Sequence, residues 1–367
     1  MENRHQGYEL AQYQSLPLQA KVSLAKYRIR QWYDHYDGNV YVSFSGGKDS
    51  TVLLHLVREL YPEVPALFCD TGLEYPEVKA FVNAQDNVVT VRPKLSFRQV
   101  IEKYGYPLIG KDAAKKIHES RAISSTYKVP RDRLLGKAMW NGEKSKYNLD
   151  RWMKVAQELP VMIDDKCCGV MKKGPSHTYG KQSGNFSYVG TLAEESRARH
   201  WSWVKYGCNA FDSKTPKSRP LSVWTEQDVL QYIVENDLQI ASVYGDVVYK
   251  DADGLEYDAR GALSPCGKLQ CSGCSRTGCV FCAFGAHLDK ESRFKRLKET
   301  HPKLYKYCID GGQWADNPKY QPDAPEYDGE WKNWNPKKIW MPSVDGLGMG
   351  KVFDMFNEIM GKELIKF

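Results

Sequence analysis

The stretch VYVSFSGGKDSTVLLHLV at residues 40–57 constrains this chain more than any other part of its sequence. A run of β-branched and aromatic residues stops at a serine–glycine turn, and an apolar, helix-like run follows at once. This order predicts a buried strand, a tight turn and the N-terminus of a helix. Main-chain N–H groups and the positive end of the helix dipole meet at such a turn, so it is an anion site.

The residue types in the turn favour phosphate as the anion. Two glycines let the backbone approach a phosphate closely, and Lys48 supplies a positive charge. Asp49 needs a bridging cation, because a carboxylate beside a phosphate is otherwise repelled, so we expect Mg²⁺ in the loaded site. The pattern differs from the G-x-x-x-x-G-K-[ST] phosphate loop. The expected phosphate-binding residues are Ser45, Gly46, Gly47, Lys48, Asp49 and Ser50.

Composition indicates a globular protein. The chain has 367 residues, of which 42% are hydrophobic and 26% charged, and it is long enough for two domains. Its first residues are polar and no apolar run approaches the length of a membrane span, so we expect a cytoplasmic protein with no membrane partner. Ten cysteines in such a protein indicate metal or redox chemistry rather than disulfides.

The net charge of +7 is concentrated in one segment. Residues 111–151 contain eleven Lys or Arg and five Asp or Glu, which gives this segment a charge of +6. A basic patch favours polyanions such as nucleic acid, whereas a solvated helical surface explains the same charge without a partner. The sequence does not separate these two interpretations.

Apolar runs alternate with amphipathic helices through the first part of the chain, which predicts an α/β fold with a doubly wound, Rossmann-like parallel sheet. Ligands of such sheets bind beyond the carboxyl ends of the strands, where Ser45 and Asp70 both fall. Thr225 and Asp228 predict a capped helix. We expect an N-terminal helical segment at 1–37, a nucleotide-binding domain at 38–240 with a helical basic insertion at about 107–160, and a cysteine- and aromatic-rich region at 241–367.

Two blocks of cysteines carry a metal hypothesis. Cys167 and Cys168 are adjacent, and Cys279 and Cys282 form a C-x₂-C pair that positions two thiolates on one centre. Adjacent cysteines suit a cuboidal cluster better than one tetrahedral zinc, so a [4Fe–4S] cluster on these four residues is expected. Cys271 and Cys274 are rival ligands, because with the later pair they give a zinc-ribbon-like C-x₂-C…C-x₂-C pattern.

Taken together, these motifs resemble the phosphoadenosine phosphosulfate (PAPS) reductase family of the PP-loop ATP pyrophosphatase, or adenine nucleotide alpha hydrolase-like, superfamily. The resemblance runs through most of residues 38–310. SGGKDS matches the family's phosphate loop, and GCVFCAFG resembles the cluster-bearing members of bacteria and phages. The other matching segments are FCDTGLEYPE, KCCGVMKKGP, YVGTLAEESRARHW and PLSVWTEQDVLQYIVENDL.

The resemblance implies a HUP-like fold and roles for further residues. Lys48 and Asp49 would act on the phosphates of ATP or PAPS, and Arg197 and Arg199 would neutralise charge on the α-phosphate. Asp70 or Thr71 would lie beside the nucleoside, and Gly190 lies in the segment that closes the nucleotide pocket.

One departure from the family separates two enzyme hypotheses. Sulfonucleotide reductases carry a C-terminal Glu-Cys-Gly-Leu-His segment, but this sequence ends in DMFNEIMGKELIKF, and its last cysteine is Cys308. We therefore expect cleavage of ATP to AMP and pyrophosphate in an iron–sulfur-dependent sulfur transfer, as in the DNA phosphorothioation sulfurtransferases, with a sulfur donor and a nucleic-acid acceptor. The alternatives are a reductase that forms sulfite with a thioredoxin-like partner, and a non-catalytic nucleotide- or nucleic-acid-binding module.

Overall fold

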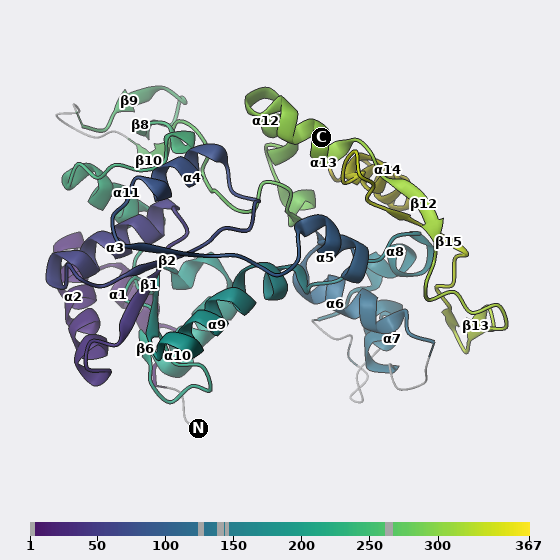
Figure 1. Cartoon of the computed structure of the whole chain (residues 1–367), viewed down its shortest axis with the longest axis horizontal. Helices are drawn as coiled ribbons and strands as arrows, with labels where there is room; N and C mark the ends of the chain where they lie inside the picture. Colours follow the sequence, from purple (N-terminus) through teal and green to yellow (C-terminus); the bar gives the residue numbers. More distant parts are fainter. Residues whose placement is uncertain (1–3, 124–127, 138–142, 144–146, 261–266) are drawn as a thin grey trace. The chain divides into compact units, whose positions relative to one another are not determined.

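The computed structural model describes residues 4–123, 128–137, 143, 147–260 and 267–367 (Figure 1). These residues form two compact units. Unit 1 comprises Met1–Pro93 and Lys172–Cys279, and unit 2 comprises Lys94–Met171 and Val280–Phe367. The sequence-based division at residues 37 and 240 stays a prediction.

Unit 1 is built on a six-stranded sheet whose strand order is β3-β2-β1-β5-β7-β6. Five strands run parallel, and β6 pairs with β7 in the antiparallel direction. The predicted α/β class with a parallel, doubly wound sheet is therefore confirmed. The strands are β1 (Val40–Ser43), β2 (Ala66–Cys69), β3 (Val88–Val91), β5 (Phe186–Val189), β6 (Asn209–Ala210) and β7 (Lys217–Ser218).

The strand order reverses beside β1, because β2 and β3 follow on one side of it and β5 lies on the other. Loops that leave neighbouring strands in opposite directions open a crevice at the carboxyl end of the sheet, which is where ligands of such folds bind. The glycine turn after β1 lies at this point. The sheet topology thus places the predicted anion site where the fold has room for a ligand.

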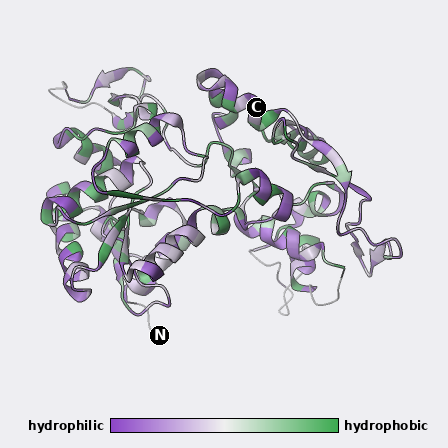
Figure 2. Ribbon diagram, viewed as in Figure 1, coloured by the Kyte–Doolittle hydropathy of each residue, from purple (hydrophilic) through white to green (hydrophobic). Residues whose placement is uncertain are grey.

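Helices cover the sheet and bury its apolar strands, which are green at the centre of unit 1 in Figure 2. The buried face of α3 includes Val52, Leu53 and Leu56, which follow the three- and four-residue spacing of a helix that packs against a core. The helices of unit 1 are α1 (Glu9–Gln14), α2 (Leu18–His35), α3 (Lys48–Leu60), α4 (Pro76–Asn83), α9 (Gly174–Ser183), α10 (Arg197–Tyr206) and α11 (Glu226–Glu235).

The N-terminal region of unit 1 forms two helices, α1 and α2. Pro17 has an extended backbone with φ −56° and ψ 149°, and it separates α1 from α2. Proline lacks the N–H that a continuous helix would use, so the break follows from its chemistry.

A small antiparallel sheet completes unit 1. Its strands are β8 (Val247–Lys250), β9 (Glu256–Asp258) and β10 (Lys268–Cys271), with β8 in the middle. A short 3₁₀ turn at Ser242–Tyr244 leads into β8. This hairpin lies within the segment that the sequence assigned to the cysteine-rich region.

Unit 2 is mostly helical, with short strand pairs. Its helices are α5 (Phe97–Tyr104), α6 (Lys111–Ser120), α7 (Lys128–Leu135), α8 (Met153–Glu158), α12 (Arg293–Thr300), α13 (Pro302–Ile309) and α14 (Met349–Met360). Its strands are β4 (Leu108–Ile109), β11 (Ala283–Phe284), β12 (Gln313–Asp316), β13 (Tyr327–Asp328), β14 (Trp331–Lys332) and β15 (Lys338–Met341).

Arg121 organises the interior of unit 2. Its buried guanidinium stacks on Trp334, with 4.3 Å from the guanidinium carbon to the ring centroid. It also donates hydrogen bonds to four main-chain carbonyls, at 2.8–3.0 Å for three of them. The four acceptors belong to Val155, Ala156, Leu159 and Val161. These groups lie at the C-terminal end of α8 and just after it, so Arg121 acts as a cap of that helix.

Among the helices that the structure describes, none is both long enough and apolar enough to cross a membrane.

A buried ion pair joins α2 to α11. Lys21 Nζ lies 2.7 Å from Asp228 Oδ2, and both side chains are largely removed from solvent. The same carboxylate accepts bonds from the N–H and hydroxyl of Thr225, which confirms the predicted cap of α11. One carboxylate therefore caps a helix and neutralises a buried lysine.

We predict that Lys21→Met lowers the free energy of unfolding by about 3 kcal/mol, because it leaves the buried Asp228 charge without its cation. Urea unfolding of the full chain, followed by circular dichroism, measures this change. Lys26→Met is the matched control, because Lys26 pairs with Glu59 at the surface and its loss should cost less than about 1 kcal/mol. Equal effects of the two substitutions would contradict the prediction.

Candidate functional site

The glycine turn after β1 has the geometry that its sequence predicts. Gly46 has φ +70°, and a Cβ at this position would lie 2.6 Å from Val82 Cγ2 and 2.7 Å from Val78 Cγ1 of α4. Glycine is thus required both by the backbone conformation and by the close packing of α4. α3 begins at Lys48, so its first N–H groups face the turn.

Hydroxyl groups tie the turn to the first turn of α3. Ser45 N and Oγ lie 3.2 and 3.1 Å from Ser50 Oγ, and Ser50 Oγ donates to Gly47 O at 2.8 Å. Thr51 Oγ1 bonds the same carbonyl at 3.1 Å. These contacts fix the loop conformation in which its N–H groups converge.

Lys48 is buried, with 4% of its side chain exposed. Its ammonium donates to Ser275 O at 2.9 Å and pairs with Glu226 Oε1 at 3.0 Å. Burial lowers the pKa of Lys48, but the carboxylates of Asp49 and Glu226 outweigh it and raise that pKa above its ordinary value. Lys48 is therefore a permanent positive charge at the loop.

Asp49 lies in the same charged group. Burial raises the pKa of its carboxyl, Lys48 opposes that rise, and Glu226 adds to it. The charges of Arg276 and Arg199 also favour the ionised form. Asp49 is partly buried, and a carboxylate of this kind fits Mg²⁺, which commonly takes one or two protein carboxylates and completes its shell with phosphate oxygens and water.

Gly190 allows the loop after β5 to approach the phosphate loop. A Cβ on Gly190 would lie 2.9 Å from Asp49 O and 3.1 Å from Ser50 Cα. Both atoms belong to the main chain, which cannot relieve the clash by changing a side-chain rotamer. Gly190 therefore belongs to the site through packing of the backbone.

Arg199 is the predicted arginine that the structure brings to the loop. It lies on α10, its guanidinium pairs with Glu195, and its charge opposes the rise in the pKa of Asp49 that burial causes. Burial and the neighbouring Arg276 lower the pKa of Arg199 itself. Arg197, the first residue of α10, is exposed.

Three residues of this group were missed by sequence reasoning: Glu226, Tyr244 and Arg276. Glu226 directly follows the helix cap at Thr225, and the other two lie near and within the cysteine-rich segment. The contacts of Lys48 with Tyr244 and Ser275 span 196 and 227 residues. Local patterns carry no information about pairings at that separation.

The predicted nucleoside residues Asp70 and Thr71 form a closed turn after β2. Asp70 Oδ2 lies 2.9 Å from Lys79 Nζ and 3.1 Å from an Arg92 guanidinium nitrogen. Burial raises the pKa of Asp70, but the hydrogen bond and charge of Lys79 and the bond from Arg92 outweigh it and lower that pKa. Asp70 is thus ionised, and two cationic side chains balance its charge at the carboxyl end of the sheet.

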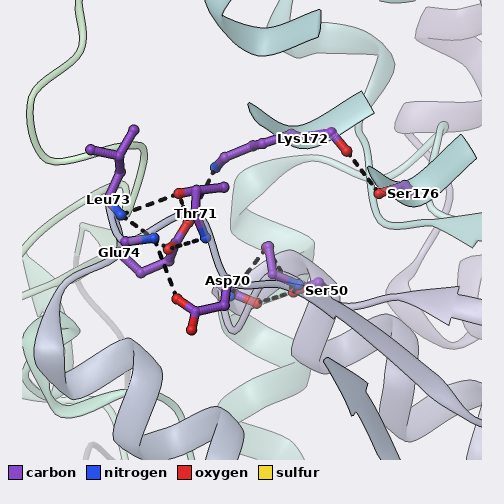
Figure 3. Close-up of polar contacts among 10 residues, drawn as sticks. Ser50, Asp70, Thr71, Leu73, Glu74, Lys172 and Ser176 are labelled. Carbon is purple, nitrogen blue, oxygen red and sulfur yellow. Dashed lines mark hydrogen bonds and ion pairs between the residues drawn. The ribbon is translucent and has the colours of Figure 1, made fainter. Parts of the chain in front are cut away.

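Figure 3 shows how Glu74 closes this turn. Its carboxylate accepts from Thr71 N at 3.0 Å, Thr71 Oγ1 at 2.7 Å and Leu73 N at 3.2 Å. Lys172 Nζ lies 3.9 Å from Glu74, and Ser176 Oγ bonds Lys172 O at 2.9 Å. The Thr71 hydroxyl is therefore engaged within the turn.

The structure divides the predicted cluster ligands between the units. Cys279 belongs to unit 1, whereas Cys167, Cys168 and Cys282 belong to unit 2. Burial raises the pKa of Cys282, and the charge of Cys168 contributes, so these two thiols interact. Among the residues that the structure describes, no three His, Cys, Asp or Glu side chains gather to hold a metal. A cluster on these four cysteines, which belong to two different units, therefore stays a prediction.

The rival ligands lie elsewhere in unit 1, close to the phosphate loop. Burial raises the pKa of Cys271 to about 11, Lys48 opposes this rise, and Glu226 adds to it. Cys274 Sγ donates to the main-chain oxygen of Arg276 at 2.8 Å. Burial thus favours the protonated form of the Cys271 thiol.

Comparison with known proteins identifies the family. The chain matches the phosphoadenosine phosphosulfate reductase domain over residues 39–134 and 136–284, which is more than half of its length. It belongs to the PAPS reductase family, and the predicted family membership is therefore confirmed.

Two individual relatives share about a quarter of their aligned residues with this chain. Sulfate adenylyltransferase subunit 2 of Psychromonas ingrahamii is 24% identical over 212 residues, which cover 56% of this chain and 60% of that protein. Adenosine 5'-phosphosulfate reductase of Chelativorans is 25% identical over 238 residues, covering 62% and 71%. A solved PAPS reductase from Candida auris aligns with 17% identity and a TM-score of 0.34, covering 62% of this chain and 91% of that one.

The depressed pKa of Asp70 gives a prediction for pH dependence. Asp70→Asn should lower stability at pH 7 by about 1–2 kcal/mol, because it removes two charge-assisted bonds. A carboxyl whose pKa is lowered by folding stabilises the protein above its unfolded-state pKa, and this contribution is lost as pH falls through the folded-state value. The difference between wild type and Asp70→Asn should therefore shrink below about pH 4. Urea unfolding at pH 7 and pH 3.5 tests this, and a constant difference would contradict it.

Proposed function

We propose that this protein binds an adenine nucleotide at the loop of residues 45–50 and cleaves ATP to AMP and pyrophosphate in a sulfur-transfer reaction. The observation that carries the proposal is the buried Lys48 ammonium beside Asp49 at the N-terminus of α3, with Arg199 and Arg276 in the same charged group. A site with this charge arrangement suits a polyphosphate bound with a divalent cation.

The residues of the site have distinct roles in this proposal. The first N–H groups of α3 and Lys48 hold the β- and γ-phosphates. An oxygen of the acceptor bonds the α-phosphorus as the bond from that phosphorus to its bridging oxygen breaks, and pyrophosphate leaves. AMP leaves in turn when the sulfur donor displaces it from the activated acceptor. Arg199 exchanges Glu195 for the α-phosphate and stabilises the charge that develops there. Mg²⁺ held by Asp49 would neutralise the phosphates. The leaving group, pyrophosphate, consists of the two phosphates that the loop binds. The N–H groups at the start of α3 therefore both bind ATP and stabilise the leaving group.

The names of the relatives support an adenine nucleotide with either of two reactions. One relative is named as an adenylyltransferase subunit and the other as a reductase of adenosine 5'-phosphosulfate. The reductase is the second candidate. Cys308, the last cysteine of the chain, is fully buried in unit 2 against Met349, and burial raises its pKa far above the ordinary value. A thiol in that state is a poor nucleophile, so Cys308 does not suit the nucleophilic role that a reductase requires. A cysteine of residues 266–274 is the other candidate for that role.

The basic segment gives limited support to a nucleic-acid acceptor. Arg121 is buried on carbonyls, Arg131 bonds Asp328 and main-chain oxygens, and Arg133 pairs with Asp112. These charges are engaged within unit 2. Residues 124–127, 138–142 and 144–146 of the segment lie outside the described residues. Nucleic acid therefore stays a proposal that rests on composition.

The function is tested by calorimetric binding of ATP with Mg²⁺ against binding of PAPS, followed by measurement of pyrophosphate release. We expect ATP to bind more tightly, and we expect Lys48→Ala to reduce turnover at least about a hundredfold by removing a charge at the reacting phosphates. Lys26→Ala is the matched control and should keep full turnover. Tighter binding of PAPS would favour the reductase, and full turnover by Lys48→Ala would exclude the proposed role of the loop.

The cluster is tested separately. We expect anaerobically purified protein to contain iron and inorganic sulfide, and Cys279→Ser or Cys282→Ser to remove the visible absorbance. Cys208→Ser is the control, because Cys208 is buried in the core of unit 1 and belongs to no proposed ligand set. Iron bound at full stoichiometry in both ligand variants would show that the ligand assignment is wrong.

A further inference from the structure

One segment of unit 1 lies on the phosphate loop, and the function proposed above assigns it no contact with the nucleotide. We call residues 272–277, Ser-Gly-Cys-Ser-Arg-Thr, the covering segment. It follows β10 directly, and its contacts with the loop involve Ser275 and Thr277. Tyr244, in the 3₁₀ turn that precedes β8, also contacts the loop through its side chain.

The covering segment and Tyr244 are held together as one piece. Gly273 N donates to Tyr244 O and Cys274 N to Val243 O, both at 2.8 Å. The two chains are so close that a Cβ at Gly273 would lie 2.5 Å from Val243 O. Movement of the covering segment therefore moves Tyr244 with it.

The Tyr244 phenol occupies the anion position of the loop. Lys48 N, at the N-terminus of α3, donates to Tyr244 Oη at 3.2 Å. Tyr244 Oη lies 2.6 Å from Thr277 Oγ1, and a Cβ at Gly47 would lie 3.2 and 3.4 Å from these two oxygens. Helix N-terminal N–H groups are where phosphate oxygens bind, so the phenol oxygen stands where a phosphate oxygen is expected.

The charged groups of the loop are engaged in a similar way. The Lys48 ammonium bonds the carbonyl of Ser275 and the carboxylate of Glu226. Arg276 extends from the covering segment with 64% of its side chain exposed, and it lies 3.9 Å from Glu195. Groups of the protein thus hold the positions that a polyphosphate requires.

We propose that the nucleotide displaces Tyr244 and that Arg276 is a further phosphate-binding residue of this site. A phosphate oxygen replaces the phenol on Lys48 N–H, and Arg276 exchanges the Glu195 carboxylate for the polyphosphate. A phosphate forms stronger, charge-assisted bonds than a neutral phenol or a carbonyl, which favours the exchange. This inference rests on the proposed function, because it concerns the same loop.

Inorganic pyrophosphate with Mg²⁺ is the probe, titrated calorimetrically into the full chain. Tyr244→Phe removes the competing oxygen and should tighten pyrophosphate binding roughly threefold to tenfold, the range of one neutral hydrogen bond. Arg276→Ala removes a charge-assisted contact and should weaken it roughly tenfold or more. If Tyr244 instead keeps its position when pyrophosphate binds, Tyr244→Phe leaves pyrophosphate affinity unchanged or weakens it. That result would overturn the proposal.

Matched controls lie on the same hairpin. Tyr257→Phe removes an exposed phenol that bonds Asp251, and Arg260→Ala removes an exposed arginine that pairs with Asp237. Neither should change pyrophosphate affinity.

The same titrations distinguish failure of the proposed function from failure of the present inference. If wild type and Lys48→Ala bind pyrophosphate and ATP equally weakly, the proposed function fails. If Lys48→Ala abolishes binding while Tyr244→Phe and Arg276→Ala behave like the controls, the present inference alone fails.

Limited proteolysis tests the same inference in the unsubstituted protein. Trypsin cleaves after Arg276, whose side chain is exposed. Saturating pyrophosphate should slow cleavage at Arg276 relative to cleavage at Arg260, because the guanidinium becomes engaged by phosphate. An unchanged or faster relative rate at Arg276 would contradict the proposal.

Discussion

The site in unit 1 depends on a single buried positive charge. Lys48 has 4% of its side chain exposed, yet its ammonium is stabilised by a carbonyl, the Glu226 carboxylate and the nearby Asp49. Burying a charge is costly unless it is paired and hydrogen-bonded, so these partners are a condition for the loop to fold with its lysine inside. In the exchange proposed above, a bound phosphate replaces some of these partners. Stability of the empty site and affinity for phosphate are therefore opposed at this residue.

The sheet supplies the rest of the site by topology. The reversal of strand order beside β1 brings the loop after β5 against the phosphate loop, and Gly190 makes that approach close enough for main-chain contact. α10 then follows and carries Arg199 into the charged group. Residues separated by about 150 positions thus meet because neighbouring parallel strands share one carboxyl edge.

The parts of the fold that were predictable from sequence are those with local causes. The strand, glycine turn and helix around residues 45–50 follow from a change of hydrophobic period at two glycines, and the cap of α11 follows from Thr225 and Asp228. The break between α1 and α2 also has a local cause, because Pro17 cannot continue a helix. The contacts of Glu226 and Tyr244 with Lys48, and the charge interaction of Arg276 with Asp49, could not be predicted from the sequence, because each depends on how distant segments pack. The ion pairs of Asp70 with Lys79 and Arg92 belong to the same kind.

Arg121 has a consequence for how this sequence can diverge. Its guanidinium satisfies four carbonyls at and beyond the end of α8 while its flat face packs on Trp334. A lysine has three donors on one nitrogen and no planar face, so an exchange that keeps the charge would leave acceptors unpaired in the interior. Position 121 is therefore expected to resist even charge-conserving replacement. Lys115, on the preceding helix α6, is exposed, and its replacement is expected to be tolerated. Within one basic segment, the structure separates a charge that is fixed by packing from one that is open to evolutionary change.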